Sequence, residues 1–224
     1  MESYRTVKSE GQDEFIERRS RFIGTVRPVT TVEEATAFLD EMRAKYWDAT
    51  HNVYAYILRD GQMKRYSDDG EPQGTAGVPV LDVLQKENLT DLAVVVTRYF
   101  GGVLLGAGGL VRAYSHGAKL GVLAGGIQVM RLCVTGTITC DYNQYGRVAT
   151  LVPQLGGRVE DTQFGMVVVL TFSLPKGAAE RLQKQLADLT CGSVTPAFSG
   201  ECFLPDPGKE GAGELEEASV KKRG

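Results

Sequence analysis

The segment that decides the fold is VVVTRYFGGVLLGAGGLVRAY, residues 94–114. Its first residues continue an apolar run from Leu92 to Thr97, which is typical of a central strand buried on both faces. Arg98 follows this run, and a second glycine cluster that begins at Gly106 precedes residues with the apolar spacing of a helix. We therefore expect a buried strand, a glycine-rich loop and a helix N-terminus in succession.

The glycine-rich loop is a candidate binding site for an anion. Glycines let backbone N–H groups converge, and the positive end of the helix dipole favours a phosphate group. Arginines on both sides of the loop could donate forked hydrogen bonds to the same anion. The alternative is that the glycines permit a tight crossover and close packing of the helix on the strand. The predicted anion- or RNA-binding residues are Arg98, Tyr99, Gly101, Gly102, Gly106, Gly108, Gly109 and Arg112, with Arg19 and Arg21 from an earlier segment.

The earlier segment is a strand or hairpin with a basic outer face. Residues 14–28 alternate in polarity, and Ile16, Phe22 and Val26 are expected on the inner face. Further signals predict a helix after a capping box at residues 31–34, strands over 53–58 and 63–66, and a helix that ends near residue 88. The outer-face arginines and later basic and aromatic residues could contact phosphates and unpaired bases of RNA: Arg18, Arg19, Arg21, Arg27, Lys64, Arg65, Tyr54, Tyr56, Tyr66, Tyr99 and Phe100. The alternative for the tyrosines is a place in the core or at its rim.

An acidic loop, SDDGEPQGT, occupies residues 67–75. Its carboxylates, Asp68, Asp69 and Glu71, could hold Mg²⁺ through water or accept hydrogen bonds from Arg98. The alternative is a sharp turn built from Asp, Gly and Pro. His51 precedes a predicted strand, so it could lie at the same sheet end and act as a general base.

The second half of the chain predicts a ferredoxin-like domain. Its expected elements are strands over 127–140, 158–163, 166–174 and 194–204, with helices over 141–154 and 178–189. This β-α-β-β-α-β order is that of the split βαβ sandwich. We therefore predict an α+β protein with domains at 1–126 and 127–204 and a disordered tail at 205–224. The second domain carries only six basic and six acidic residues over 128–204, which suits docking of a protein partner.

Composition excludes several classes of protein. The 224 residues include 25 basic and 28 acidic side chains, so any nucleic-acid site must be a local patch. No apolar run approaches the ~18 residues of a membrane span, and no apolar leader is present, which predicts a cytoplasmic protein. The cysteine spacing favours no zinc site, and we predict no cofactor.

Several motifs resemble, in order, those of the IMPACT/YigZ family. They are SRFI at residues 20–23, ATHNVYAY at 49–56, DDGEPQGTAG at 68–77 and TRYFGG at 97–102, with Leu105-Gly106 beyond them. The resemblance covers residues 1–125, and the remainder is similar to the small C-terminal domain of YigZ-type members. It implies a first domain with the fold shared by a small-subunit ribosomal protein, domain four of elongation factor G and the GHMP kinases. It also implies a second domain like domain five of elongation factor G.

The resemblance links the protein to translation. Eukaryotic members are tied to translational control through competition for the activator of a kinase that phosphorylates a translation initiation factor. The leading hypothesis is therefore a translation-linked, non-enzymatic protein that binds RNA or the ribosome through the glycine-rich loop. The alternatives are a metal-assisted enzyme acting on a phosphorylated small molecule or phosphodiester, with His51 as base, and a protein-interaction module.

Overall fold

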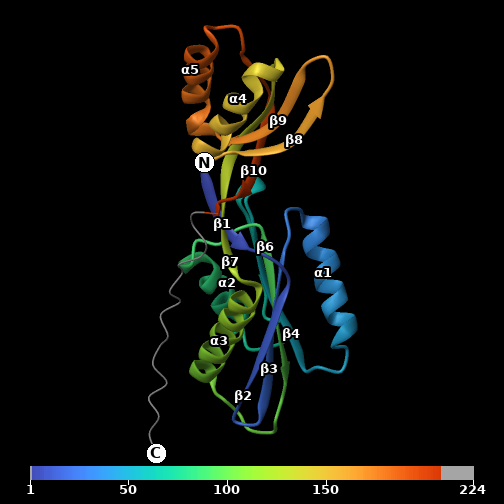
Figure 1. Ribbon diagram of the computed structural model, residues 1–224. Helices are drawn as coiled ribbons and strands as arrows, with labels where there is room; N and C mark the ends of the chain where they lie inside the picture. Colours follow the sequence, from blue (N-terminus) through green and yellow to red (C-terminus); the bar gives the residue numbers. More distant parts are fainter. Residues whose placement is uncertain (1, 208–224) are drawn as a thin grey trace, which may run out of the picture. The chain divides into compact units, whose positions relative to one another are not determined.

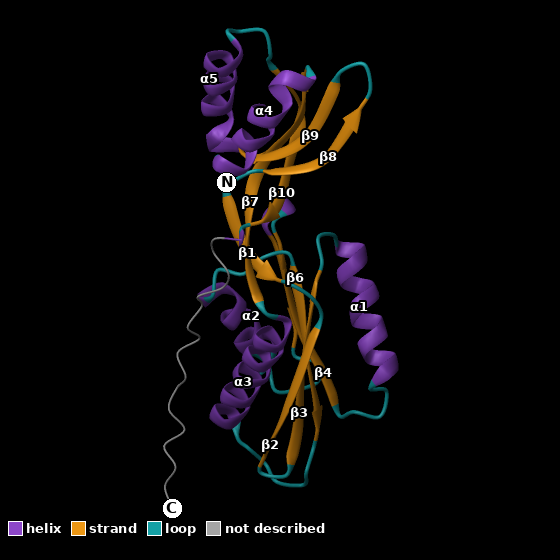
Figure 2. Ribbon diagram, in the orientation of Figure 1, coloured by secondary structure: helices purple, strands orange, loops and turns teal. Residues whose placement is uncertain are grey.

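The chain forms two α+β units in a computed structural model that describes residues 2–207. One unit contains residues 4–129, and the other contains residues 130–206 together with residues 2 and 3. Each unit has its own sheet and helices, which Figure 2 colours by secondary structure. Each unit also has its own hydrophobic core. The α+β class is therefore confirmed, whereas most of the predicted tail lies outside the described residues.

The first unit is built on a five-stranded antiparallel sheet. Its strand order is β2-β3-β6-β4-β5, and β6 lies at the centre as the apolar run predicts. A short β1 pairs instead with β7. The strands are β1 (Ser3–Val7), β2 (Gly11–Glu17), β3 (Ser20–Pro28), β4 (His51–Leu58), β5 (Met63–Ser67) and β6 (Leu92–Tyr99).

Helices cover both faces of this sheet, which explains why β6 is apolar at every position from Leu92 to Val96. Helix α1 (Val32–Lys45) packs through Phe38 against Ala93 and Val95, in one core cluster. Helices α2 (Gly77–Lys86) and α3 (Ala107–Gly125) share the other cluster with Val94 and Val96. Figure 1 shows α1 on the side of the sheet opposite α2 and α3.

Helix α3 approaches the sheet closely because glycines meet at the contact. Gly24 of β3 faces Gly117 of α3, and a Cβ on Gly24 would overlap the Gly117 carbonyl group. Gly121, one helical turn further, faces the same backbone. Close helix–strand packing thus depends on glycines within β3 and the body of α3.

The β2–β3 hairpin differs in one respect from the sequence-based expectation. Glu17 pairs with Ser20, so only Arg18 and Arg19 form the turn. A two-residue turn places residues of opposite parity on the same face, and Phe15 therefore packs beside Phe22. The prediction that Ile16 shares the inner face with Phe22 is wrong, since Ile16 is 72% exposed.

The second unit has the expected ferredoxin-like organisation. The antiparallel strand order is β10-β7-β9-β8, and α4 and α5 pack in one core with these strands. Asp141 caps α4 by accepting a hydrogen bond from the Gln144 backbone N–H at 2.8 Å. The elements are β7 (Ile127–Cys140), α4 (Tyr142–Gln154), β8 (Arg158–Phe164), β9 (Val168–Pro175), α5 (Ala179–Thr190) and β10 (Pro196–Pro205).

Candidate functional site

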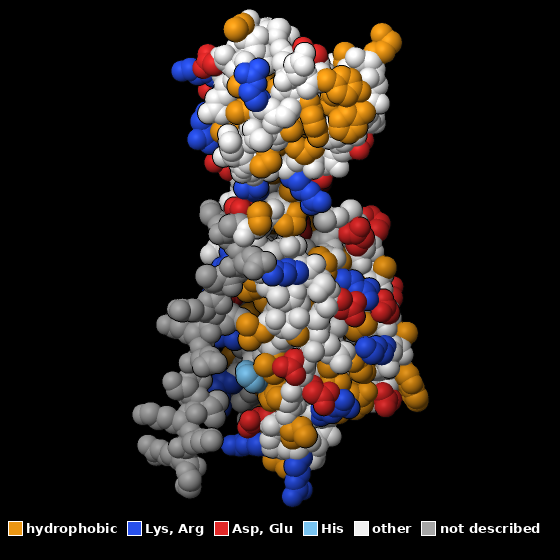
Figure 3. All heavy atoms as spheres, in the orientation of Figure 1, with side chains coloured by type: hydrophobic (Ala, Val, Ile, Leu, Met, Phe, Trp, Pro, Cys, Tyr) orange, Lys and Arg blue, Asp and Glu red, His pale blue; other side chains and the backbone are white. Residues whose placement is uncertain are grey.

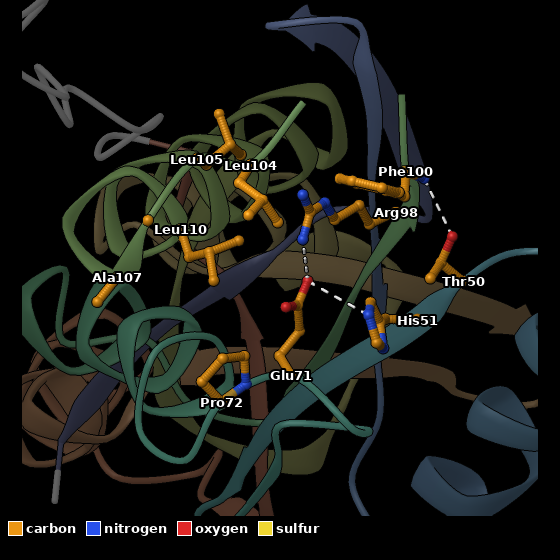
Figure 4. Close-up of a pocket in the computed structure, with 11 residues that line it drawn as sticks. Thr50, His51, Glu71, Pro72, Arg98, Phe100, Leu104, Leu105, Ala107 and Leu110 are labelled. Carbon is orange, nitrogen blue, oxygen red and sulfur yellow. Dashed lines mark hydrogen bonds and ion pairs between the residues drawn. The ribbon is translucent and has the colours of Figure 1, made fainter. Parts of the chain in front are cut away.

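A pocket of about 390 Å³ opens in the first unit, beside the end of β6 and the start of α3. This volume lies in the range of small-molecule pockets. Figure 4 shows leucines on one side of it and polar side chains on the other. The lining residues are Thr50, His51, Glu71, Pro72, Arg98, Phe100, Leu104, Leu105, Gly106, Ala107 and Leu110.

Arg98 is committed to a buried ion pair inside the protein. Strand β6 delivers the side chain, which is only 4% exposed as a residue, to Glu71 from the acidic loop. Arg98 Nη1 donates to Glu71 Oε1 at 2.6 Å, and Nη2 donates to Ser20 Oγ at 3.3 Å. The guanidinium charge is therefore neutralised at close range, which leaves it poorly placed to act as the main ligand of an external phosphate.

Tyr114 completes this buried network from helix α3. Its hydroxyl donates to Glu71 Oε1 at 2.7 Å, the same oxygen that receives Arg98. Burial, followed by the hydrogen bond to Glu71, raises the pKa of Tyr114 far above its ordinary value, so the phenol stays protonated. Sequence reasoning missed this role, although a tyrosine on the apolar face of a helix signals that its hydroxyl has a buried partner.

His51 lies against the acidic loop with a defined tautomer. Its Nδ1 is 2.7 Å from the backbone carbonyl oxygen of Asp69, which can only accept. Nδ1 must therefore carry a proton, and in the neutral ring Nε2 is left as an acceptor. Nε2 lies 3.7 Å from Glu71 Oε1, and His51 lines the pocket.

The three carboxylates of the acidic loop do not converge. Asp68 accepts from the backbone N–H groups of Gly74 and Gly77 at 2.9 and 2.8 Å. The Asp69 carboxylate accepts from the Asn52 backbone, while Glu71 faces Arg98. Over residues 2–207 no group of three or more His, Cys, Asp or Glu side chains could hold a metal ion. The magnesium-site alternative is therefore wrong for these residues, because turn formation and the ion pair occupy them.

The glycine loop touches the tip of the β2–β3 hairpin. Gly101 lies so close to Arg19 that a Cβ would overlap the Arg19 carbonyl group. Its N–H also donates to Ser20 Oγ at 3.3 Å. Gly102 and Gly106 adopt positive φ angles of 81° and 69°. The loop thus joins the hairpin tip to the pocket, and Gly106 directly precedes α3.

Two arginines at this hairpin tip adopt a conformation that glycine or asparagine normally takes. Arg18 and Arg19 have φ angles of +43° and +68°. Left-handed backbone at a non-glycine residue costs about 1–2 kcal/mol. Both side chains are exposed, and within residues 2–207 neither forms an ion pair or side-chain hydrogen bond. The same holds for exposed Arg112 of α3, next to Gly108.

Two other predicted arginines, Arg21 and Arg27, are neutralised by neighbours, whereas Lys64 and Arg65 of β5 are exposed and form no ion pair within residues 2–207. Arg21 pairs with Glu14 at 2.6 Å, and Arg27 pairs with Glu41 at 2.7 Å and also with Glu10. On the face shown in Figure 3, Lys and Arg side chains of the first unit lie among Asp and Glu side chains. The expected basic face of the hairpin is therefore largely charge-compensated, and free guanidinium groups are concentrated at its tip.

Aromatic and apolar side chains border the pocket. Phe100 is 45% exposed and lies 5.4 Å from the Arg98 guanidinium carbon, measured to the ring centre, while Leu104 is 81% exposed. Tyr99 donates to Asp48 at 2.8 Å, and burial raises the pKa of its phenol. Neither Tyr99 nor the other predicted tyrosines line the pocket: Tyr54 and Tyr56 stack at 6.4 Å, and Tyr66 is exposed on β5 beside Lys64 and Arg65.

In the second unit, exposed apolar side chains cluster around the β8–β9 turn. Tyr142 and Phe164 stack with ring centres 6.3 Å apart, and Met166 and Val167 are exposed in the same turn. This cluster lies within residues 128–204, where the sequence suggests a protein partner, and that suggestion stays a prediction. No helix within residues 2–207 is long and apolar enough to cross a membrane.

Comparisons with known proteins cover both units. The family model of the Impact N-terminal domain matches residues 18–122, and that of a domain of unknown function (DUF1949) matches residues 138–193. The chain is 42% identical over 149 residues to IMPACT family member YvyE of Bacillus subtilis, covering 66% of this chain and 69% of the relative. It is 35% identical over 180 residues to IMPACT family member YigZ of Escherichia coli, covering 79% and 88%. A crystal structure of a hypothetical protein has a TM-score of 0.57 and 32% identity, covering 89% of this chain and 98% of its own.

Proposed function

Because this chain belongs to the IMPACT family, we propose that it is a translation-linked protein whose first domain binds a single-stranded segment of RNA. The binding surface consists of an arginine rim, defined as Arg18, Arg19 and Arg112, together with the adjoining pocket. The rim meets the phosphates, and the apolar border of the pocket meets the bases. The link to translation comes from the family, and the RNA surface comes from the site.

The observation that carries this proposal is the conformation of the hairpin tip. Arg18 and Arg19 occupy positions where Asn-Gly would be more stable, and their guanidinium groups are unpaired within the described residues. Strained backbone that persists at one place points to a functional constraint there. Two neighbouring guanidinium groups that have no partner in the protein can each donate forked hydrogen bonds to phosphate oxygens.

Single-stranded RNA fits this surface better than a duplex. Exposed Phe100 and Leu104 stand beside the glycine loop that contacts the hairpin tip. Unpaired bases can stack on such side chains, whereas bases in a helix already stack on one another. A protein with a formal net charge of −3 also needs a local rim to attract a polyanion.

The test is fluorescence anisotropy with a labelled, unstructured RNA at several salt concentrations. The variant is Arg18→Ala/Arg19→Ala/Arg112→Ala, and the matched control is Arg147→Ala/Arg158→Ala/Arg181→Ala, which removes three exposed arginines from the second domain. Each lost phosphate contact lowers the slope of log affinity against log salt by about 0.7, so the rim variant should lose about 2 in slope. The control should bind like the wild type.

Two results would overturn the proposal. One is a wild-type protein that does not bind unstructured RNA at low salt. The other is a rim variant whose affinity and salt slope equal those of the wild type and of the control. Thermal melting of all three proteins establishes that the substitutions leave the fold intact, which is expected because each replaced side chain is exposed.

A further inference from the structure

The four cysteines of the chain lie in the second unit, and two of them face each other across neighbouring strands. Cys133 of β7 is the direct partner of Cys202 of β10 in the antiparallel register. Directly opposite residues of an antiparallel pair lie on the same face of the sheet, so both thiols project from one face. Cys140 pairs instead with Val168, and Cys191 lies outside the strands.

The backbone spacing across this pair suits a disulfide bond. The Leu132 N–H donates to the Glu2 carbonyl oxygen at 2.7 Å, whereas β10 lies along the other edge of β7. Successive N–H groups of a strand point to opposite edges, so the Cys133 N–H points toward β10 and the cysteines occupy a hydrogen-bonded position of the ladder. The Cα atoms at such a position are about 5.5 Å apart. Disulfide-bonded residues usually have their Cα atoms about 4.4–6.8 Å apart.

Closing the bond requires a small local movement of β10. Cβ atoms across an antiparallel pair are about 4.5–5.5 Å apart, whereas a disulfide prefers about 3.8 Å. Within residues 2–207 β10 pairs only with β7, and its register shifts between Phe198 and Gly200. This edge strand can therefore approach β7, but the closed bond keeps some strain. Strained disulfides are reduced more easily than relaxed ones.

The two thiols differ in access, which assigns their order of reaction. Cys202 is partly exposed, so a small molecule can reach it, while Cys133 is only 2% exposed. Burial raises the pKa of the Cys133 thiol, the positive charge of Arg131 opposes this rise, and a negative charge on Cys202 adds to it. Once Cys202 is held in a mixed disulfide its charge is gone, and Arg131 still favours the Cys133 thiolate. Cys202 is thus the attacking thiol and Cys133 the resolving thiol.

We propose that Cys133 and Cys202 form a reversible disulfide when the protein meets a low-molecular-weight disulfide. The Cys202 thiolate attacks one sulfur of that molecule, its S–S bond breaks, and one small thiol leaves with the proton that Cys202 gave up. The Cys133 thiolate then attacks the Cys202 sulfur, and the second small thiol leaves with the Cys133 proton. Two protein thiols are oxidised and one small disulfide is reduced to two thiols. The new bond fixes β10 to β7, and it does not depend on RNA binding.

The test is oxidation of the folded protein by glutathione disulfide, followed by alkylation to count thiols and by intact mass measurement. Exposed Cys191 can take up glutathione on its own, so Cys191→Ser is the reference protein. It should lose two of the three thiols that remain from the four cysteines, and it should carry no glutathione. Its mass should fall by about 2 Da, because two thiol hydrogens are removed. Excess reduced glutathione should restore all three thiols, since the bond is strained.

Two substitutions added to the reference protein separate the roles of the thiols. With Cys202→Ser, both remaining thiols should stay reduced, because Cys133 and Cys140 are buried. With Cys133→Ala, the reaction should stop at the mixed disulfide, which leaves one glutathione on Cys202. Circular dichroism checks that each variant folds. If the alanine variant does not fold, Cys202→Ser decides alone, because it replaces a partly exposed side chain.

The proposal is overturned if the reference protein keeps its three thiols in excess glutathione disulfide, or if it retains a glutathione adduct instead of closing an internal bond. An internal bond that still forms with Cys202→Ser also overturns it. Cys140 belongs to the core on the other face of β7, so such a bond would report unfolding and not the cross-strand pair. A bond that excess reduced glutathione fails to open contradicts the reversible reaction.

Discussion

At the residue scale, the role of Arg98 is structural, because it forms an ion pair inside the protein. Its position after an apolar strand suggests an anion ligand, yet the guanidinium faces Glu71 at 2.6 Å in a buried setting. Removing one member of such a pair leaves the other charge buried without compensation. The role of Arg98 is thus to hold the acidic loop and α3 against the sheet, since Glu71 also receives Tyr114.

Because of this role, we expect substitutions of Arg98 and Arg112 to lower the free energy of unfolding by different amounts. Arg98→Ala should lower the free energy of unfolding by roughly 3–5 kcal/mol, because Glu71 loses its partner. Arg112→Ala should change it by no more than about 0.5 kcal/mol, because the side chain is exposed. Urea denaturation followed by circular dichroism measures both values. Equal stabilities of the two variants would refute the buried-pair account.

We expect the buried phenol of Tyr114 to make the free energy of unfolding fall at alkaline pH. Its folded-state pKa is raised by burial and by Glu71, whereas the unfolded phenol titrates near 10. Below about pH 10 the phenol is protonated in both the folded and the unfolded protein, and its full contribution to the free energy of unfolding is present. Above about pH 10 only the unfolded protein loses this proton, so the free energy of unfolding falls as the pH rises. Tyr114→Phe removes this linkage. From pH 9 to 11 the variant should lose about 1.4 kcal/mol less than the wild type in urea denaturation, and parallel losses would contradict the assignment.

At the element scale, the β2–β3 turn combines poor local stability with two free guanidinium groups. Replacing Arg18 and Arg19 by Asn and Gly supplies the residues that a two-residue hairpin with positive φ prefers. Arg18→Asn/Arg19→Gly should therefore raise the free energy of unfolding by about 1–3 kcal/mol, since each left-handed arginine costs about 1–2 kcal/mol. The same variant should bind RNA more weakly and with a shallower salt dependence.

Stability and binding are thus expected to change in opposite directions in one protein. Urea denaturation and anisotropy on the same preparation measure both quantities, and Arg147→Asn serves as a control on an exposed helix surface. A more stable variant with unchanged RNA affinity would show that the turn conformation serves no binding role. A less stable variant would show that other contacts, such as that with Gly101, determine the turn.

The elements themselves were predictable because local signals specify them. The apolar run of β6, the Asp141 cap and the β-α-β-β-α-β order each depend on neighbours in sequence, and the structure confirms them. The face of Ile16 was not predictable from alternation alone, since it depends on the length of the turn. Pairing fixes which residues share a face, and alternation within one strand does not show the pairing.

The site was only partly predictable, for a similar reason. Sequence reasoning offered the acidic-loop carboxylates as acceptors for Arg98 and placed His51 at the same sheet end, but it did not show which carboxylate meets Arg98. The meeting depends on strand register: His51 pairs with Arg98 across β4 and β6. Glu71 and Tyr114 are 43 residues apart and meet through the packing of α3. Which charges are neutralised inside the protein and which stay free is a property of the tertiary structure, and free charges decide ligand binding.

At the scale of the whole molecule, charge is nearly balanced and binding depends on local surfaces. Because the formal net charge is −3, we expect the arginine rim of the first domain to attract RNA. The second domain has its own core and an exposed aromatic cluster around the β8–β9 turn. RNA contacts are therefore expected on the first domain and not on this aromatic cluster.

The most direct measurement is ultraviolet cross-linking of the full-length protein to unstructured RNA, with tryptic digestion and mass spectrometry. The account predicts cross-links on the peptide of residues 99–112, which contains exposed Phe100 and the glycine loop, and their loss in Arg18→Ala/Arg19→Ala/Arg112→Ala. Cleavage after Arg98 defines this peptide in both proteins, and the variant peptide simply extends beyond residue 112. Cross-links confined to residues 142–167 of the second domain would contradict the account.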